Sequence, residues 1–181
     1  MNFTEFKLNA QILSGVKELG YETATPIQEK AIPSILAGLD VVGTAQTGTG
    51  KTAAFALPLL QRLMDGPRGQ LRGLILAPTR ELAEQIRQSI DRLAIRTGLR
   101  CTAIYGGANL VKQYQILRRG VDIVIACPGR LLDHINRGNI NLTQVEVLVL
   151  DEADHMFDLG FREPIYKIIR HLPKKRQNLL F

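Results

Sequence analysis

The chain has 181 residues, of which 45% are hydrophobic and 22% are charged. This length and this balance are typical of one folded domain with a real core, and they exclude a disordered segment. The formal net charge of +6 is compatible with an anionic partner, but the basic residues are scattered along the chain. Residues 1–5 do not resemble a secretory signal, and no apolar stretch is long enough to span a membrane. We therefore expect a cytoplasmic protein that does not bind a membrane.

Helical and extended patterns alternate along the whole chain. The first helix is expected between a cap at Asn9 and a stop at Gly20, and Thr25 is expected to cap the second. Further helices are predicted over residues 26–36, 53–63, 81–97, 109–118, 131–136 and 163–171. Strands are predicted over residues 40–44, 73–77, 101–105, 121–126 and 145–150, with another from residue 178. Apolar strands separated by helices predict an α/β fold with a doubly wound parallel sheet and helices on both faces.

A glycine-rich turn follows the first strand and leads into a helix. Its residues are Ala45, Gln46, Thr47, Gly48, Thr49, Gly50, Lys51 and Thr52. Backbone N–H groups in such a loop converge on a phosphate, and the helix start adds partial positive charge. Lys51 would reach the β- and γ-phosphates, and the Thr52 hydroxyl would ligate Mg²⁺. Ala45 stands where the general phosphate-loop pattern has its first glycine, and the alternative is an ordinary turn before a helix.

Two carboxylates follow the apolar strand over residues 145–150. Asp151 would lie at the carboxyl edge of the sheet, where it can hold Mg²⁺ through water. Glu152 would orient or deprotonate a water that attacks the γ-phosphate. The alternative is a solvated loop after a strand.

Residues 151–154 read Asp-Glu-Ala-Asp and resemble the signature of the DEAD-box ATP-dependent RNA helicases. The phosphate loop is similar to the form found in that family, in which Ala commonly takes the first position. Within the family, the sequence is most similar to the bacterial RhlE-like branch. The resemblance covers essentially the whole chain. It implies a RecA-like P-loop NTPase domain that uses ATP and Mg²⁺, with Lys51, Asp151 and Glu152 as catalytic residues.

Residues 20–28 resemble the family's Q motif, and Phe3 stands at its isolated upstream aromatic position. The Gln28 amide offers both a donor and an acceptor to the adenine edge, and Tyr21 would stack on the adenine face. Ala24 departs from the Pro that is usual in the family. Without the resemblance, we would interpret Gln28 as an exposed helix residue and Phe3 as a residue that anchors the core.

Three further segments resemble motifs that face RNA in the family. They contain Pro78, Thr79 and Arg80, then Gly106 and Gly107, and finally Pro128, Gly129 and Arg130. These groups suit sugar and phosphate rather than base edges, so we expect little sequence specificity. The alternative reading makes Arg80 and Arg130 surface or ion-paired residues. Cys127 stands where the family usually has Thr, which puts one hydroxyl contact in doubt.

The remaining chemistry-bearing side chains receive no site. Cys101 and Cys127 do not form a C-x-x-C pair. We expect both cysteines to act as small buried hydrophobic residues of a protein in a reducing compartment. His134, His155 and His171 show no metal-ligand spacing.

The resemblance divides the chain into a Q-motif region over residues 1–29, packed on the ATPase domain, and a helicase ATP-binding domain over residues 30–181, the first RecA-like domain. The chain ends where the family continues into a Ser-Ala-Thr motif, so we expect these residues to be the first domain of a longer chain that also carries the second RecA-like domain. Alone, the chain should be monomeric, bind nucleotide weakly and hydrolyse it slowly. The alternatives are an ATP-gated RNA clamp without unwinding activity and a DNA-directed superfamily 2 helicase.

Overall fold

The structure is a computed structural model that describes residues 1–46 and 48–181. Thr47, a predicted phosphate-loop residue, lies outside the described residues. The elements in chain order are η1 (Phe3–Phe6), α1 (Ala10–Glu18), α2 (Pro26–Leu36), β1 (Val41–Val42), α3 (Lys51–Met64), β2 (Gly73–Leu76), α4 (Arg80–Leu93), β3 (Cys101–Ile104), α5 (Leu110–Arg118), β4 (Ile123–Ala126), α6 (Pro128–Asn136), β5 (Val147–Leu150), α7 (Ala153–Asp158), α8 (Arg162–Ile169) and β6 (Gln177–Leu180).

The named strands form one parallel sheet in the order β1-β6-β5-β2-β4-β3. Each connection between neighbouring parallel strands crosses over through helical segments, which is the winding that the alternating pattern predicts. The predicted α/β fold with a parallel sheet and helices on both faces is therefore confirmed. Among the described residues, no helix combines the length and the apolar character needed to cross a bilayer.

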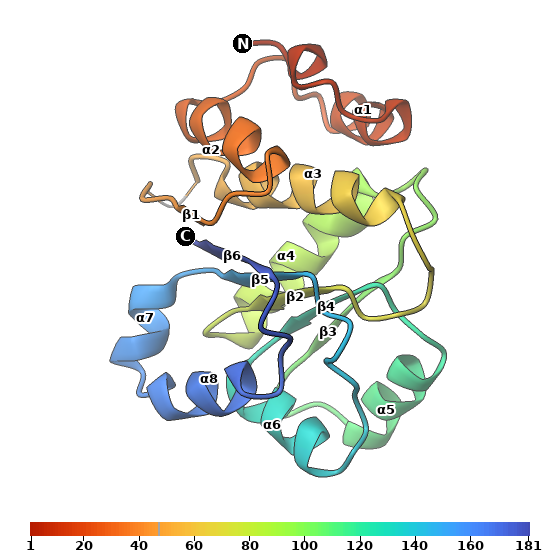
Figure 1. The fold of residues 1–181 in the computed structure, drawn as a ribbon, viewed down its shortest axis with the longest axis vertical. Helices are drawn as coiled ribbons and strands as arrows, with labels where there is room; N and C mark the ends of the chain where they lie inside the picture. Colours follow the sequence, from red (N-terminus) through yellow and green to blue (C-terminus); the bar gives the residue numbers. More distant parts are fainter. Residues whose placement is uncertain (47) are drawn as a thin grey trace.

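Alternate residues of the central strands feed two separate cores. On one face, Ile75 and Val149 pack with helices α1 to α4. On the other face, Leu74 and Leu148 pack with helices α6, α7 and α8. Figure 1 shows these two helical layers above and below the sheet. β2, β4 and β5 are buried at every position because both faces are covered.

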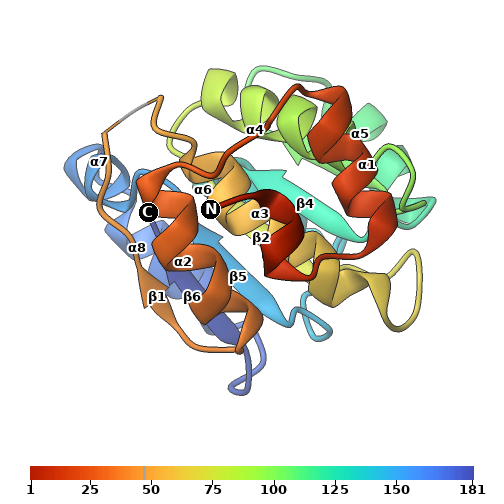
Figure 2. The same cartoon turned by 90° about the horizontal axis from the view of Figure 1, so that it is seen from above.

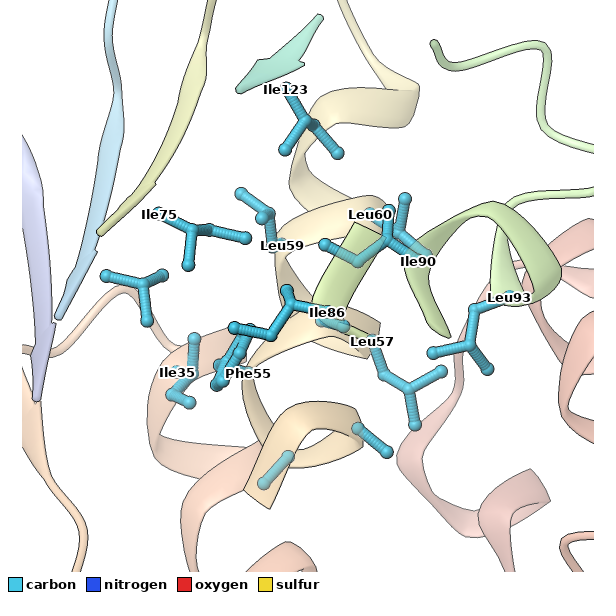
Figure 3. Close-up of a cluster of buried hydrophobic side chains, with 14 of the residues drawn as sticks. Ile35, Phe55, Leu57, Leu59, Leu60, Ile75, Ile86, Ile90, Leu93 and Ile123 are labelled. Atoms are coloured by element: carbon cyan, nitrogen blue, oxygen red, sulfur yellow. The ribbon is translucent and has the colours of Figure 1, made fainter. Parts of the chain in front are cut away.

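Helix α3 is buried on nearly all sides, because the sheet lies beneath it and other helices cover it. Figure 3 shows Phe55, Leu57, Leu59 and Leu60 of this helix among side chains of α2, α4, β2 and β4. The first turn of α3 therefore starts from a rigid base. That first turn carries the predicted phosphate-binding residues.

The N-terminal segment lies across α3 and α4, as Figure 2 shows from above. Ile12 and Val16 of α1 join the same core as α3, together with Phe3 and Phe6 of η1. Gly15 allows the close approach, since a Cβ there would lie 2.4 Å from the backbone oxygen of Leu93. Side chains of the predicted Q-motif region, residues 1–29, thus belong to the same core as α3 and α4.

Several element bounds differ from the sequence-based expectation. β1 has only two residues and lies at the edge of the sheet, where it pairs with β6 alone. α4 ends at Leu93 rather than at residue 97, because the Thr97 hydroxyl donates to the Ala94 carbonyl and accepts from the N–H of Leu99. η1 and α7, which have four and six residues, were not predicted.

Candidate functional site

Apart from the Q-motif residues, which come before β1, the segments with predicted chemistry follow the carboxyl ends of strands. Because the sheet is parallel, those ends lie along one edge. The sheet order places the phosphate loop after β1, residues 151–152 after β5, residues 78–80 after β2, residues 128–130 after β4 and residues 106–107 after β3. The predicted nucleotide residues and the predicted RNA residues thus occupy adjoining parts of the same edge.

A pocket of about 350 Å³ lies at the start of α3. Its lining residues are Tyr21, Gly48, Gly50, Lys51, Thr52, Ala53, Leu82, Gln85, Ser89, Leu93, Asp151 and Glu152. Lys51 is also shared with a neighbouring pocket of about 270 Å³ that is lined in part by Ala45 and Asp154. The structure therefore brings together residues that are separated by about 100 positions in the sequence.

Gly50 precedes α3 with a φ of 88°, in the left-handed region that favours glycine. This conformation turns the chain from the loop into the helix, so that Lys51 and Thr52 begin the first turn. A helix start of this kind leaves backbone N–H groups without helical partners, and those groups suit an anion. Gln46 and Gly48 are exposed, and the Thr49 hydroxyl donates to the Gln46 carbonyl at 2.6 Å.

Asp151 is 3% exposed and lies directly after β5. Burial raises the pKa of its carboxyl group to about 6, against the opposing effect of the Lys51 charge. Among the described residues, its buried Oδ1 atom has no hydrogen-bond partner. A buried carboxylate oxygen that lacks a partner is unfavourable unless a ligand satisfies it.

These donors fit a hydrated Mg²⁺ ion. The ion prefers oxygen ligands and usually keeps several waters, so one carboxylate and one hydroxyl suffice on the protein side. Asp151 offers the unpartnered Oδ1, and Thr52 lines the same pocket. Within the described part of the chain, no group of three or more His, Cys, Asp or Glu side chains could hold a metal. A site for magnesium here would therefore depend on the nucleotide for further ligands.

Glu152 adopts the left-handed conformation with a φ of 53°. Such a conformation is unfavourable for a residue with a side chain and tends to occur at functional sites. The Glu152 carboxylate is held by the imidazole Nδ1 of His155 at 3.2 Å. His155 was assigned no chemistry from the sequence, although its position three residues after Glu152 on a helix predicts such a contact.

Gln28 is buried, which contradicts the alternative of an exposed helix residue. Its Oε1 accepts from the N–H of Thr25 at 2.9 Å, and its Nε2 donates to the Gly50 carbonyl at 3.0 Å. The amide still has one N–H and one lone pair for a ligand. The Thr25-x-x-Gln28 spacing is that of a capping box, a signal that could have predicted the first of these bonds.

Phe3 is 3% exposed and packs in the core, whereas Tyr21 is 42% exposed and lines the pocket. Their rings stack at 6.2 Å between centroids. Phe3 is therefore placed behind Tyr21 rather than at the pocket surface. The N–H of Ala24 donates to the Met1 carbonyl at 2.9 Å, a bond that the Pro usual in the family could not make.

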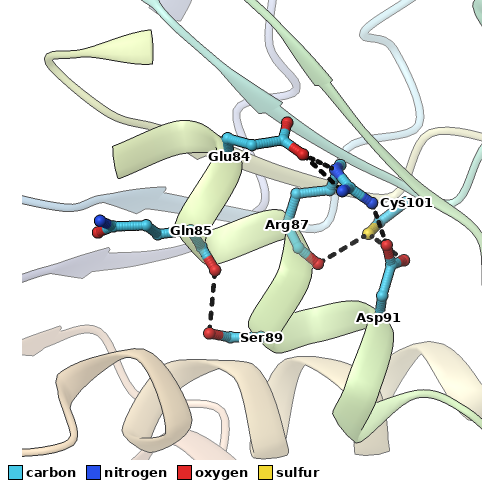
Figure 4. Close-up of polar contacts among 6 residues, drawn as sticks. All are labelled: Glu84, Gln85, Arg87, Ser89, Asp91 and Cys101. Carbon is cyan, nitrogen blue, oxygen red and sulfur yellow. Dashed lines mark hydrogen bonds and ion pairs between the residues drawn. The ribbon is translucent and has the colours of Figure 1, made fainter. Parts of the chain in front are cut away.

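The polar face of α4 supplies two pocket residues that the sequence did not indicate, Gln85 and Ser89. They lie one turn apart, and the Ser89 hydroxyl donates to the Gln85 carbonyl at 3.0 Å. Figure 4 shows this pair beside the ion pairs of Arg87. Polar residues at i and i+4 on an otherwise amphipathic helix were the available signal.

Both cysteines are half-buried and free, so they are more accessible than predicted. Cys101 donates its thiol proton to Asp91, as Figure 4 shows, and burial together with that bond raises its pKa. Burial raises the pKa of Cys127 to about 11. Neither thiol is therefore a nucleophile at neutral pH.

The predicted RNA-contacting segments are residues 78–80, 106–107 and 128–130. Thr79, Arg80, Gly106, Gly107 and Gly129 are exposed. The Thr79 hydroxyl accepts from the N–H of Leu82 at 3.2 Å and keeps its own proton for a ligand. The Arg80 guanidinium lies 4.9 Å from the ring centroid of Tyr105.

The other three predicted RNA residues lie deeper. Pro78 and Pro128 are buried, so they shape their turns rather than face solvent. The Arg130 side chain is 12% exposed, and its Nη1 group donates to the Ala108 carbonyl at 2.9 Å and to Gln113 at 3.0 Å. One nitrogen of the guanidinium is thus bonded inside the protein. Nε of Arg130 also lies 3.5 Å from the Asp133 carboxylate, which agrees with the alternative reading of an ion-paired arginine.

Comparisons with known proteins agree with the chemistry predicted for the residues along this edge of the sheet. The sequence profile of the DEAD/DEAH box helicase family matches residues 25–181. The chain is 48% identical to the ATP-dependent RNA helicase CshA of Listeria monocytogenes, with 99% of this chain and 34% of the relative covered. It is 45% identical to the DEAD-box ATP-dependent RNA helicase CshA of Streptococcus pneumoniae, with 100% and 34% covered.

A fungal protein, the ATP-dependent rRNA helicase rrp3 of Emericella nidulans, is 48% identical, with 99% of this chain and 39% of the relative covered. The chain therefore spans about a third of the length of the curated relatives it matches. The assignment to the RhlE-like branch stays a prediction. The profile match and the identity over the whole chain show that this protein belongs to the DEAD/DEAH box helicase family.

Proposed function

We propose that this chain is the nucleotide-binding unit of an ATP-dependent RNA helicase. The observation that carries the proposal is the pocket at the start of α3, in which Lys51 and Thr52 meet Asp151, whose buried Oδ1 atom has no hydrogen-bond partner among the described residues. Phosphates of ATP would lie on the loop over residues 45–52. Bound there, Mg²⁺ would neutralise phosphate charge as the γ-phosphoryl group is transferred.

The residues of this chain take separate roles. Lys51 holds the β- and γ-phosphates, Thr52 and Asp151 hold the magnesium, and Glu152 orients the attacking water with His155 behind it. Tyr21 and the free N–H and lone pair of Gln28 recognise adenine, which gives residues 1–29 their function. We further propose that a second RecA-like domain completes the site and that the protein acts in the cytoplasm, where free thiols persist.

RNA would bind along the neighbouring part of the edge. The exposed Thr79, Arg80, Gly106, Gly107 and Gly129 offer a hydroxyl, a guanidinium and backbone N–H groups at or near helix starts. Such groups recognise sugar and phosphate and are indifferent to sequence. Strand separation then follows from coupling this contact to the nucleotide site through the shared edge.

Two variants of this chain separate the nucleotide roles. Lys51→Ala should abolish binding of a fluorescent adenine nucleotide in a titration with Mg²⁺. Glu152→Gln should keep the affinity within about twofold, because a neutral amide still fits and the residue acts on water rather than on phosphate. Lys167→Ala, at an exposed position on α8, is the matched control for loss of a positive charge. Equal binding by Lys51→Ala and the native chain would refute the proposal.

RNA preference is tested in the same chain by competition. A single-stranded RNA should displace a labelled RNA better than DNA of the same sequence, and raising the salt should weaken binding. Arg80→Ala should weaken it further. Better displacement by the DNA would favour the DNA-directed alternative.

A further inference from the structure

Gln113 lies on α5, outside every segment with predicted chemistry, yet it is only 6% exposed. It is the only residue of α5 that is buried. A polar side chain in that position must have its hydrogen bonds satisfied inside the protein. The bonds that it makes lead to two of the three predicted RNA-contacting segments.

The first bond leads to the segment after β3. The Gln113 Nε2 group donates to the Tyr105 carbonyl at 3.1 Å, directly before Gly106 and Gly107. The Arg80 guanidinium lies over the ring of the same tyrosine, 4.9 Å from its centroid. Tyr105 thus joins the start of α4 to the glycine pair, and Gln113 holds Tyr105 by its backbone.

The second bond leads to the start of α6. Gln113 Oε1 accepts from Arg130 Nη1 at 3.0 Å, and the same nitrogen donates to the Ala108 carbonyl at 2.9 Å. Both N–H groups of Nη1 are therefore used, and Nε lies 3.5 Å from the Asp133 carboxylate, so Nη2 is the guanidinium nitrogen that these contacts leave for an outside anion. Arg130 is turned in this way toward the loop that contains Gly107.

The orientation of the Gln113 amide is determined by its partners. The Tyr105 carbonyl only accepts and Arg130 only donates, so oxygen and nitrogen cannot be exchanged. His134 Nε2 lies 3.1 Å from the same Oε1 and must therefore carry a proton, while Nδ1 accepts from Asn139 at 3.3 Å. Each bond in the set requires the others, which favours a single arrangement.

We propose that Gln113 is a positioning residue that holds Tyr105, the loop over residues 106–108 and Arg130 in one arrangement for RNA. The inference rests on the proposed function for its ligand, the RNA sugar-phosphate backbone. Gly106 and Gly107 have little rigidity of their own, because glycine has the widest conformational range. Gln113 and Arg130 bond to the carbonyl groups on either side of that pair and so limit the range.

The test compares Gln113→Leu with Gln115→Leu, the same change at an exposed position two residues later on α5. Gln113→Leu should raise the Kd for a single-stranded RNA about tenfold, the effect of losing one or two net hydrogen bonds. The Kd for adenine nucleotide should stay within about twofold, because the nucleotide pocket does not include Gln113. Gln115→Leu should change neither value.

A measurement without RNA tests the positioning role separately from a fold defect and from the proposed RNA binding. Backbone order parameters of residues 106–108 should be near 0.85 in the native chain and should fall toward ~0.6 in Gln113→Leu. Gln113→Glu keeps the acceptor for Arg130 and loses the donor to Tyr105, so its order parameters should be intermediate.

The outcomes separate the two ideas. Unchanged order parameters in Gln113→Leu would overturn the positioning role, whether or not RNA binds. Loss of order with an unchanged RNA Kd would overturn the inference as well. A native chain that binds no RNA in the competition assay would instead overturn the proposed function.

Discussion

Gln28 is the residue whose replacement should affect both the fold and the nucleotide site. Its amide closes the start of α2 through the Thr25 N–H and reaches the phosphate loop through the Gly50 carbonyl, 22 residues away. Gln28→Leu keeps a similar volume but removes both bonds. It leaves a donor and an acceptor in a half-buried site without partners.

The expected cost follows from those two groups. A buried group that loses its partner costs about 1–3 kcal/mol, and partial solvent access at both sites places the sum near ~3 kcal/mol. For a domain of this size, that loss lowers the Tm by roughly 6–12 °C. Gln11→Leu, on the exposed face of α1, should change the free energy of unfolding by less than about 0.5 kcal/mol.

Urea unfolding followed by circular dichroism measures the difference, and nucleotide titration adds the functional part. If Gln28 only supports the loop, Gln28→Leu should weaken the binding of adenine and guanine nucleotides equally. If its free N–H and lone pair also recognise adenine, the affinity for the adenine nucleotide should fall more than the affinity for the guanine nucleotide. A variant as stable as Gln11→Leu would refute the structural reasoning, because both bonds would then contribute nothing.

Two further predictions concern the phosphate loop and pH. Gly50→Ala should weaken nucleotide binding and lower stability more than Gly48→Ala, since both have positive φ but only at Gly50 would a Cβ lie 2.4 Å from the Gln28 amide nitrogen; equal losses in a paired titration would contradict this. Burial, aided by the Arg130 charge, lowers the pKa of His134 below its ordinary value of 6.5. The unfolded chain therefore binds that proton more readily, so the free energy of unfolding should fall as the pH drops below 6.5. His134→Gln should reduce that slope in urea titrations at several pH values, and an unchanged slope would exclude His134 as its source.

Most of the fold could be predicted because its signals are local. A cap such as Asn9, which accepts from the backbone N–H of Gln11, depends on neighbouring residues alone. Continuous apolar runs predicted strands covered on both faces. The short elements η1 and α7 were missed, because a few residues give a weak helical period.

The amino-acid sequence by itself determined which residues could carry chemistry: the phosphate loop, the carboxylates at positions 151 and 152, and the alternation that places both at one sheet edge. Only the tertiary structure decided what each side chain contacts. It buried Phe3 behind Tyr21, bonded Gln28 to Gly50, turned part of Arg130 inward and made Gln113 a junction. The physical reason is that caps and strand patterns depend on neighbours in the chain, whereas hydrogen-bond partners of buried polar groups are chosen when distant segments pack together.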